Sequence, residues 1–469
     1  MFLMTDGEGK RWLIAASVLG VLGLAHTPAR AADVGGDCCA DLEERVAELE
    51  ATTARKGNKK VTVEVYGKVN RALLFWDDGA EQNVYSVENG YNTDRFGIRG
   101  KAKINGDWSG GYRMEWEHRF AFSRLVNQID DDNVENGTEL LTRHSYIFLN
   151  HKKYGEVRLG LTQSPYDNIN KDTMVYGNVI DTVTQDFFMN QGFFLRPKGF
   201  DTEVGPPDLR FIDINRCYTS AAVFDCSTRR NMVVYESPKV LGSKDGNGLW
   251  ANWGWGEDDI WSASLRYKDE WGENFKVGAG IGYEDFRDER LQAGGGGLAG
   301  FQRDIKEWGA SASILHTPTG LFVTGAYSTS ENDDTNRINA GVFTGTSSPD
   351  MDAWDVQGGV HKKFLDLGLS TFLVGYTNGQ DGVGGAGGPT RLIAANRLPG
   401  VGIATEITGS ETDKWYFVYD QEVVPGALNL YIAYQHITPE IDLVDSGLAP
   451  VNVPLDDFDL VYTGARIYF

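Results

Sequence analysis

The chain has 469 residues and combines 57 glycines with 12 Trp, 20 Tyr and 23 Phe. Glycine and aromatic residues in these numbers favour many short strands over helices. The formal net charge of −22 argues against a nucleic-acid partner, because a protein that binds phosphates needs a basic surface. The acidic balance fits acidic exposed loops, and it would equally fit simple solubility.

The first 31 residues have the layout of a secretory signal peptide. Lys10 and Arg11 precede the apolar run 12–24, and residues 29–31 supply an A-x-A cleavage site. The run is too short to span a bilayer, and no later segment offers about 18 unbroken apolar residues. We therefore expect residues 1–31 to be a cleaved signal peptide, and we expect no transmembrane helix.

Residues 32–60 form an N-terminal segment that we expect to lie in the periplasm. Its apolar residues fall on one stripe over 41–56, with acids early and basic residues late, which predicts a short helix. The helix has room for about two heptads, which is marginal for a helix alone. It is either a small oligomerisation helix or a solvated leader. Adjacent Cys38 and Cys39 cannot bridge each other without strain, and nothing marks them as a lipoprotein anchor.

From Val61 onward, strand patterns alternate with turns and loops. Alternate residues of 95–104 and of 112–122 are apolar or aromatic, whereas many residues between them are charged. Such faces suit lipid on one side and a wet lumen on the other, and the chain offers no second apolar set for a soluble core. Arg71 breaks the pattern because it shares the parity of apolar neighbours; a subunit contact would shelter it.

Short turns alternate with long loops along this region. The predicted turns are Asn105-Gly106, Tyr154-Gly155, 271–273, 318–320, Leu367-Gly368 and Pro425-Gly426, and the predicted loops are 286–304, 331–350, 379–412 and 440–456. The count is about sixteen strands, an even number, as an antiparallel outer-membrane barrel requires. Acidic clusters at 130–132, 331–334 and 456–457 either hold divalent cations that bridge to lipopolysaccharide or are merely solvated.

One connection, residues 165–228, is much longer than the others. Loops of this length are rare unless they are functional or disordered, and the many aromatic residues here argue against disorder. Cys217 and Cys226 have the spacing of a clamped loop, so we expect a disulfide if the chain is exported. A zinc site is disfavoured because no CxxC or nearby HxxxH accompanies the pair.

The last residues, LVYTGARIYF, form a strand whose alternate positions from Phe469 back to Val461 are mostly apolar. A strand that ends on a terminal Phe resembles the assembly signal of bacterial outer-membrane barrels. With the export signal, it indicates a transmembrane antiparallel β-barrel over residues 61–469, in the outer membrane of a Gram-negative bacterium.

Four segments resemble, in order, strands of the Gram-negative general porins: VYGKVNRALLF, DRFGIRGKAKINGDWSGGYRMEWE, TRHSYIFLNHKKYGEVRLG and RRNMVVYESPKVLG. The leader DLEERVAELEATTARKGN followed by VEVYG is similar to alphaproteobacterial members. The resemblance implies an all-β fold, a sixteen-stranded barrel whose long third loop folds into the lumen. It also implies a homotrimer that passes small hydrophilic solutes and ions by diffusion.

The resemblance also implies a constriction, in which basic wall residues face acids of the third loop. The motifs place Lys68, Arg95 and Arg143 in the basic row, and Arg99 shares the polar face of Arg95. Arg229 or Arg230 belongs near the same level. The family's PEFGG stretch is absent, so the acids are assigned to Asp172, Asp181 and Asp186. Opposed rows of charge create a transverse field that orders water and screens solutes.

Other functions fit the sequence less well. The histidines are scattered and no GxSxG element accompanies them, so we expect neither an enzyme nor a cofactor or metal site. A substrate-selective channel is the main alternative, followed by an adhesin and by a secreted soluble β protein. Conductance in a bilayer would separate a channel from the last class.

Overall fold

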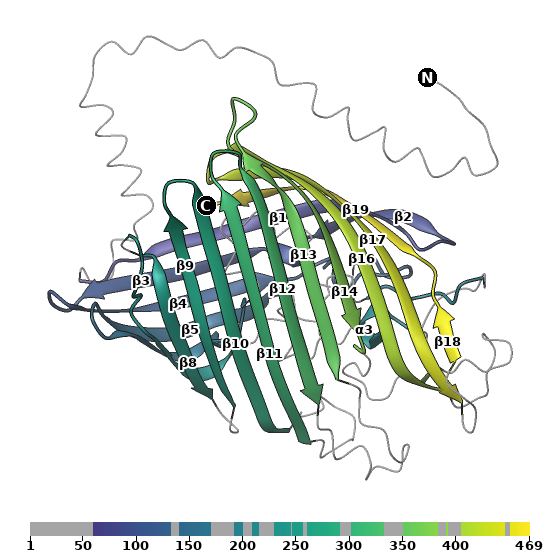
Figure 1. Cartoon of the computed structure of the whole chain (residues 1–469), viewed down its shortest axis with the longest axis horizontal. Helices are drawn as coiled ribbons and strands as arrows, with labels where there is room; N and C mark the ends of the chain where they lie inside the picture. Colours follow the sequence, from purple (N-terminus) through teal and green to yellow (C-terminus); the bar gives the residue numbers. More distant parts are fainter. Residues whose placement is uncertain are drawn as a thin grey trace. The chain divides into compact units, whose positions relative to one another are not determined.

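The structure is a computed structural model that describes residues 60–132, 140–169, 192–199, 209–214, 229–244, 246–256, 260–290, 302–332, 350–382, 391–392, 405–445 and 451–469. Within these ranges nearly all regular structure is β-strand (Figure 1). The exceptions are two short helices, η1 (Gly90–Asn92) and α3 (Phe211–Ile214). No helix in the described ranges is long and apolar enough to cross a membrane. The predicted signal peptide, the 41–56 helix, and both cysteine pairs lie outside these ranges.

Sixteen of the described strands form an antiparallel sheet that closes on itself, so the predicted barrel is confirmed. The seam joins β1 (Glu64–Asp77) to β19 (Phe458–Tyr468), and β3 (Arg95–Lys103) pairs with β1 on its other edge. The ring continues from β3 to β19 through β4 (Trp108–His118), β5 (Leu140–His151), β6 (Gly155–Gln163), β7 (Arg229–Glu236), β8 (Gly248–Gly256), β9 (Trp261–Trp271), β10 (Phe275–Arg290), β11 (Gln302–His316), β12 (Leu321–Asn332), β13 (Met351–Lys362), β14 (Ser370–Gln380), β16 (Thr405–Val424) and β17 (Leu428–Asp445).

Three further described strands extend hairpins without joining the ring. β2 (Gln82–Glu88) pairs with β1, β15 (Arg391–Leu392) with β16, and β18 (Val451–Pro454) with β17. Both β2 and β3 pair with β1. β3 pairs with residues 64–68 of β1, and β2 pairs with residues 71–77. The chain between β2 and β3 therefore turns within the wall.

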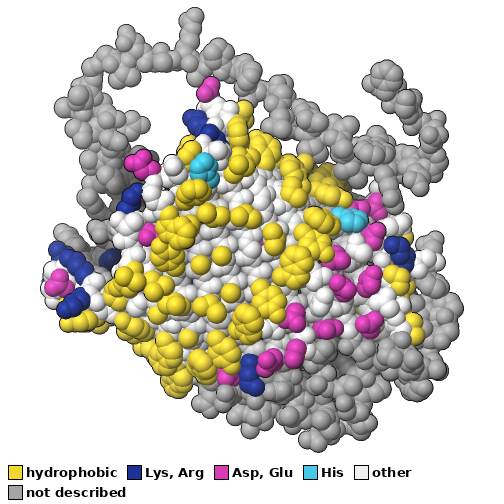
Figure 2. Space-filling view, viewed as in Figure 1, with side chains coloured by type: hydrophobic (Ala, Val, Ile, Leu, Met, Phe, Trp, Pro, Cys, Tyr) yellow, Lys and Arg dark blue, Asp and Glu magenta, His cyan; other side chains and the backbone are white. Residues whose placement is uncertain are grey.

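The period-two pattern separates the outer face of the barrel from its lumen. In β1, Val65, Val69 and Leu73 are exposed on the outside, whereas Asn70 and Ala72 between them are buried on the inside. Hydrophobic side chains cover much of the outer surface (Figure 2). Outward apolar residues of a closed sheet have no core to pack against, so this surface fits the hydrocarbon of a bilayer.

Aromatic residues with polar tips lie where the hydrophobic surface ends. Figure 2 shows acidic side chains gathered along that edge. Three outward tyrosines donate their hydroxyls to aspartates: Tyr327 to Asp352, Tyr376 to Asp413 and Tyr434 to Asp459. Amphipathic rings at such a level are typical of a membrane–water interface.

The six predicted short turns are confirmed, each at the boundary between consecutive strands of the ring. Several of these turns and the C-terminus lie at the same end of the barrel (Figure 1). Gly155 shows why glycine is needed there. Its φ is +89°, and a Cβ atom would lie 2.1 Å from the carbonyl oxygen of Glu236.

The predicted bounds of all four long loops are wrong, because strands extend into each of them. β10 continues to Arg290, β11 begins at Gln302 and β12 continues to Asn332. Residues 405–412 belong to β16, and β17 continues to Asp445. These strands pair with each other along this extra length, which satisfies their backbone hydrogen bonds beyond the hydrophobic surface. Phe122 was also expected on the outward face, but it is buried. The reason is that β4 ends at His118 and the chain turns inward, with Ala121 at a φ of +47°.

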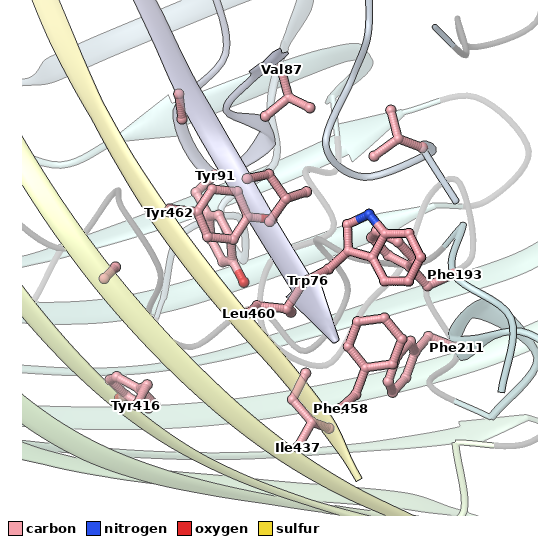
Figure 3. Close-up of a cluster of buried hydrophobic side chains, with 14 of the residues drawn as sticks. Trp76, Val87, Tyr91, Phe193, Phe211, Tyr416, Ile437, Phe458, Leu460 and Tyr462 are labelled. Carbon is pink, nitrogen blue, oxygen red and sulfur yellow. The ribbon is translucent and has the colours of Figure 1, made fainter. Parts of the chain in front are cut away.

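Buried apolar side chains gather on the inner face of the seam (Figure 3). Trp76 of β1 and Phe458 of β19 pack with Phe193 and Phe211, which belong to the long connection. The ring centroids of Phe193 and Phe458 are 5.0 Å apart. This side of the lumen therefore has an apolar core that fastens part of the connection to the wall.

Candidate functional site

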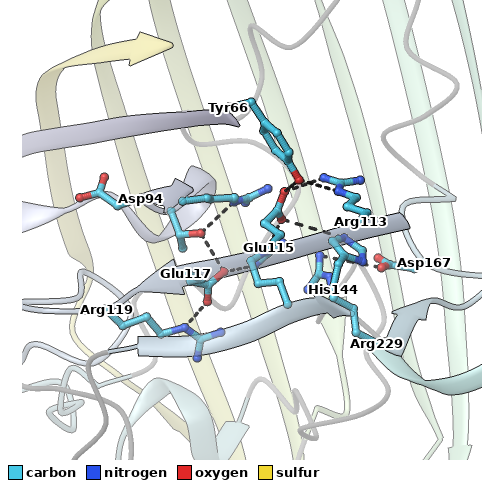
Figure 4. Close-up of polar contacts among 12 residues, drawn as sticks. Tyr66, Asp94, Arg113, Glu115, Glu117, Arg119, His144, Asp167 and Arg229 are labelled. Carbon is cyan, nitrogen blue, oxygen red and sulfur yellow. Dashed lines mark hydrogen bonds and ion pairs between the residues drawn. The ribbon is translucent and has the colours of Figure 1, made fainter. Parts of the chain in front are cut away.

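Charged side chains gather on the inner face of β3, β4 and β5 (Figure 4). Glu115 of β4 is almost completely buried there and contacts two arginines. Arg113 Nη2 lies 2.6 Å from Glu115 Oε2, and Arg143 Nε donates to Oε1 at 3.2 Å. The Tyr66 hydroxyl donates to Oε2 at 2.9 Å. A buried carboxylate needs such ion pairs and hydrogen bonds, so this cluster compensates the charge of Glu115.

Glu117 is the second buried acid of β4 and joins further basic residues to the cluster. Arg143 Nη1 and Arg119 Nε both contact its carboxylate. The Thr93 hydroxyl also donates to it at 2.8 Å, and Arg95 Nε donates to Thr93 Oγ1 at 3.1 Å. Arg95 is thus held beside Glu117 through one hydroxyl group.

A β-bulge in β5 brings two consecutive side chains into the cluster. Across the β4–β5 pair, Glu115 lies opposite His144, while Trp116 lies opposite Thr142, which leaves Arg143 as the extra residue. An extra residue in a strand shifts the alternation of faces. Arg143 and His144 are therefore both buried on the inner side. If the strand alternated strictly, one of these two side chains would face the lipid.

The other early basic residues separate into two groups. Lys68 lies opposite Arg95 in the register of β1 and β3 and is half-buried, so it belongs to the same level. Arg99 lies nearer the end of the short turns. Its Nε donates to Glu64 at 2.8 Å, and about half of each side chain is exposed, 52% and 55%. Arg99 thus lies at the exposed edge of the cluster, with its guanidinium carbon 4.9 Å from the ring centroid of Tyr66.

Arg229 and Arg230 begin β7 and are both partly buried. Arg229 lies opposite Gln163 and Arg230 opposite Thr162 in β6. Arg229 Nη2 is 4.0 Å from Oδ2 of Asp167, a buried acid at the start of the long connection. The sequence left open which of the two arginines joins the basic wall; the contact with Asp167 favours Arg229.

Several acids of the site were not predicted as such. Glu115 and Glu117 lie among the charged residues of 112–122, for which the sequence predicts only a polar face. On the far side of the ring, Glu284 of β10 and Glu307 of β11 lie opposite each other and are buried, as is Asp355 of β13. In each strand these acids occupy the alternate positions whose side chains face the lumen. That alternation in the sequence is the signal that would have identified them. The predicted loop acids Asp172, Asp181 and Asp186 and the predicted Cys217–Cys226 disulfide lie outside the described residues.

The first part of the long connection contacts the inner face of β9 and β11. The Tyr166 N–H donates to Ser262 Oγ at 3.0 Å, and Arg266 Nη2 donates to the carbonyl of Pro165 at 2.7 Å. Ser311 Oγ donates to the carbonyl of Ile169 at 2.6 Å. These contacts attach residues 164–169 to the wall on the β9–β11 side.

A later part of the same connection contacts the seam side. Besides the aromatic core around Phe193, the Ser410 hydroxyl of β16 donates to the carbonyl of Ile214 at 2.9 Å. Arg196 is buried, and its Nε lies 2.9 Å from Asp78 Oδ2. Its carbonyl accepts from the N–H of Asp456 at 2.8 Å. Burial raises the pKa of the Asp456 carboxyl, so its neutral form persists to higher pH than in an exposed aspartate.

A family model described as Gram-negative porin matches residues 21–442. Among solved structures, the anion-selective porin from Comamonas acidovorans is 16% identical over 87% of this chain and 100% of that chain, with a TM-score of 0.52. OmpT, an outer membrane protein of Vibrio cholerae, is 15% identical over 88% of this chain and 99% of that chain, with a TM-score of 0.49. No curated protein matches the chain.

Proposed function

The chain belongs to the Gram-negative porin family and forms an outer-membrane channel for passive diffusion, and we propose that it selects its solutes between its basic wall and its long connection. The assignment as a channel rests on the closed ring of sixteen described strands. This ring has charged side chains on the inside and apolar side chains on the outside. Small hydrophilic solutes and ions are the class that such a lumen admits.

The contacts of the long connection support its part in the constriction. Residues 164–169 are attached to β9 and β11, whereas residues 192–195 and 209–214 are attached to β1, β16 and β19. In the ring of sixteen these two sets of strands are four to eight positions apart. These two sets of contacts support the proposal that the connection narrows the pore.

The charges of the two walls support a transverse field. We assign the basic row to Lys68, Arg95, Arg143, Arg229 and Arg230, with Arg99 nearer the short turns. On the far wall, Glu284, Glu307 and Asp355 are the acids that face it, together with the predicted loop acids Asp172, Asp181 and Asp186. Opposed charges across a narrow aqueous lumen act on ions and dipolar solutes by electrostatics at short range.

Planar-bilayer recording tests the proposal. Purified mature protein should give stepped conductance, and a salt gradient should give a reversal potential that reports ion preference. Charged and neutral sugars of equal size should then pass at different rates. Silence in the bilayer would refute the pore. Saturation of the flux of one sugar, with little passage of its isomers, would favour a substrate-selective channel instead.

We propose a homotrimer as the assembled form. Arg71 supports this: its side chain points outward from β1, is 43% exposed, and pairs with Asp94 at 2.8 Å. A charged group on the lipid face of a barrel costs about 2–4 kcal/mol near the bilayer midplane, so a neighbouring subunit that covers it would be favourable. Crosslinking in native membranes should give a three-subunit species; a monomer at all concentrations would exclude it.

The remaining assignments concern export and assembly. Residues 1–31 are proposed as a cleaved signal peptide, residues 32–60 as a periplasmic segment, and residues 61–469 as the barrel; the leader also supports an alphaproteobacterial type. Phe469 is the proposed assembly signal, lipopolysaccharide the proposed lipid partner, and Cys217–Cys226 the proposed disulfide. Catalysis is not part of the proposal, because the family consists of channels.

A further inference from the structure

Three side chains meet on the outer face of the barrel, at the break in the wall between β2 and β3. Glu88 ends β2, Asp94 precedes β3, and His118 ends β4. One ligand atom from each lies within 4.8 Å of the other two. Both carboxylates are buried, whereas the imidazole of His118 is 36% exposed. The group thus consists of two buried carboxylates and an accessible histidine.

The backbone holds both carboxylates in place. Glu88 Oε1 accepts from the N–H of Asp94 at 2.8 Å, and Asp94 Oδ1 accepts from the N–H of Asn70 at 2.6 Å. Asp94 also pairs with Arg71, which balances one of the two negative charges. A bound metal ion would balance the second charge, because a nearby cation stabilises a buried carboxylate. The N–H of Phe120 also donates to Glu88 Oε2, at 3.3 Å.

The distance between Glu88 and His118 suits a bridging metal better than a direct ion pair. Glu88 Oε2 and His118 Nδ1 are 3.4 Å apart. A charge-assisted N–H···O bond is about 2.7–2.9 Å long. Two ligand atoms about 2.0–2.1 Å from a tetrahedral zinc ion lie about 3.4 Å from each other. The observed separation therefore matches an edge of a coordination tetrahedron.

We propose that Glu88, Asp94 and His118 bind a divalent transition-metal ion, of which Zn²⁺ is the best match. One imidazole and two carboxylates are ligands that zinc accepts, with the fourth position left to water or to a neighbouring subunit. The ion joins the C-terminal end of β2 to the start of β3 and the end of β4. The site lies on the outer face, so it is separate from the constriction.

The test uses mature protein refolded in detergent, with its cysteines alkylated so that thiolates do not bind metal. Titration with ZnCl₂ by calorimetry should give one site per chain, and Co²⁺ should give the visible absorption of tetrahedral coordination. His118→Ala and Glu88→Gln should each weaken Zn²⁺ binding by at least about tenfold. His436→Ala is the matched control, because His436 contacts a single carboxylate, Asp459, at 2.8 Å on the same outer face.

Retained heat-modifiable mobility shows which variants are folded. If Glu88→Gln misfolds, His118→Asn provides a second variant. It replaces a partly exposed side chain, so we expect it to fold. Absence of Zn²⁺ binding by the unaltered chain would overturn the proposal. Equal binding by the unaltered chain, His118→Ala and His118→Asn would overturn it as well. Channel conductance is measured separately, so a failed metal site leaves the pore assignment untouched.

Discussion

Arg143 and Arg99 carry the same charge but lie in different surroundings. Arg143 is buried between Glu115 and Glu117, whereas Arg99 is half-exposed and pairs with the exposed Glu64. Water screens the field of an exposed pair, while a buried group acts on the lumen with little screening. Position in the barrel therefore decides how strongly each arginine affects a passing ion.

Arg143→Ala should shift the reversal potential toward cations, because two buried carboxylates lose their shared partner. A unit charge about 4 Å from an ion in water-like surroundings changes its energy by about 1 kcal/mol, or about fivefold in the permeability ratio. Arg99→Ala is the matched control and should change the ratio much less. Equal shifts in the reversal potential of the two variants would mean that Arg143 does not lie in the constriction.

At the level of elements, the connection between β6 and β7 depends on a few anchors. Phe193 is buried against Trp76 and Phe458, and the buried Arg196 pairs with Asp78. Neither anchor belongs to the hydrogen-bonded ring itself. Loss of an anchor should therefore free the connection while the barrel stays closed.

Phe193→Ala should release the seam side of the connection, because truncating a buried Phe costs about 3–5 kcal/mol. Trypsin should then cleave faster after Lys198, with no change in the heat-modifiable mobility of the barrel. Phe120→Ala, which truncates an outward-facing ring, is the control and should leave the cleavage rate as it was. An unchanged rate in Phe193→Ala would mean that other contacts hold the connection.

At the scale of the whole molecule, the barrel closes by joining the two ends of its strand sequence. The N–H of Gly67 donates to the carbonyl of Phe469 at 2.9 Å, and the N–H of Phe469 donates back at 3.0 Å. The Phe469 ring lies over Gly67, where a Cβ atom would come within 2.4 Å of it. The ring itself is 64% exposed. The backbone of Phe469 thus belongs to the seam, while its side chain remains accessible.

Phe469→Ala should separate these two roles. Both backbone hydrogen bonds persist, so the variant should refold in detergent with nearly unchanged thermal stability. In cells, the amount of heat-modifiable protein in the outer membrane should fall severalfold if the aromatic side chain is the assembly signal. Ile467→Ala, also outward and exposed, provides the control. A parallel loss in both variants would point to general destabilisation.

The sequence alone determined the barrel. Alternation of apolar and charged residues is a local property, and a closed sheet preserves it, as Val65, Val69 and Leu73 show. Turn positions such as Tyr154-Gly155 and Pro425-Gly426 also follow from local chemistry, because the backbone there requires glycine. The same alternation placed Arg95 and Lys68 on the inner face.

The tertiary structure decided which charges meet. Glu115 and Arg143 are 28 residues apart and join only because β4 and β5 pair, and the bulge at Arg143 cannot be read from alternation. Glu284 and Glu307 likewise became neighbours through register. The cluster of Glu88, Asp94 and His118 depends on a break in the wall between two strands. Side-chain parity is encoded locally, but contacts between distant strands arise only when the sheet closes.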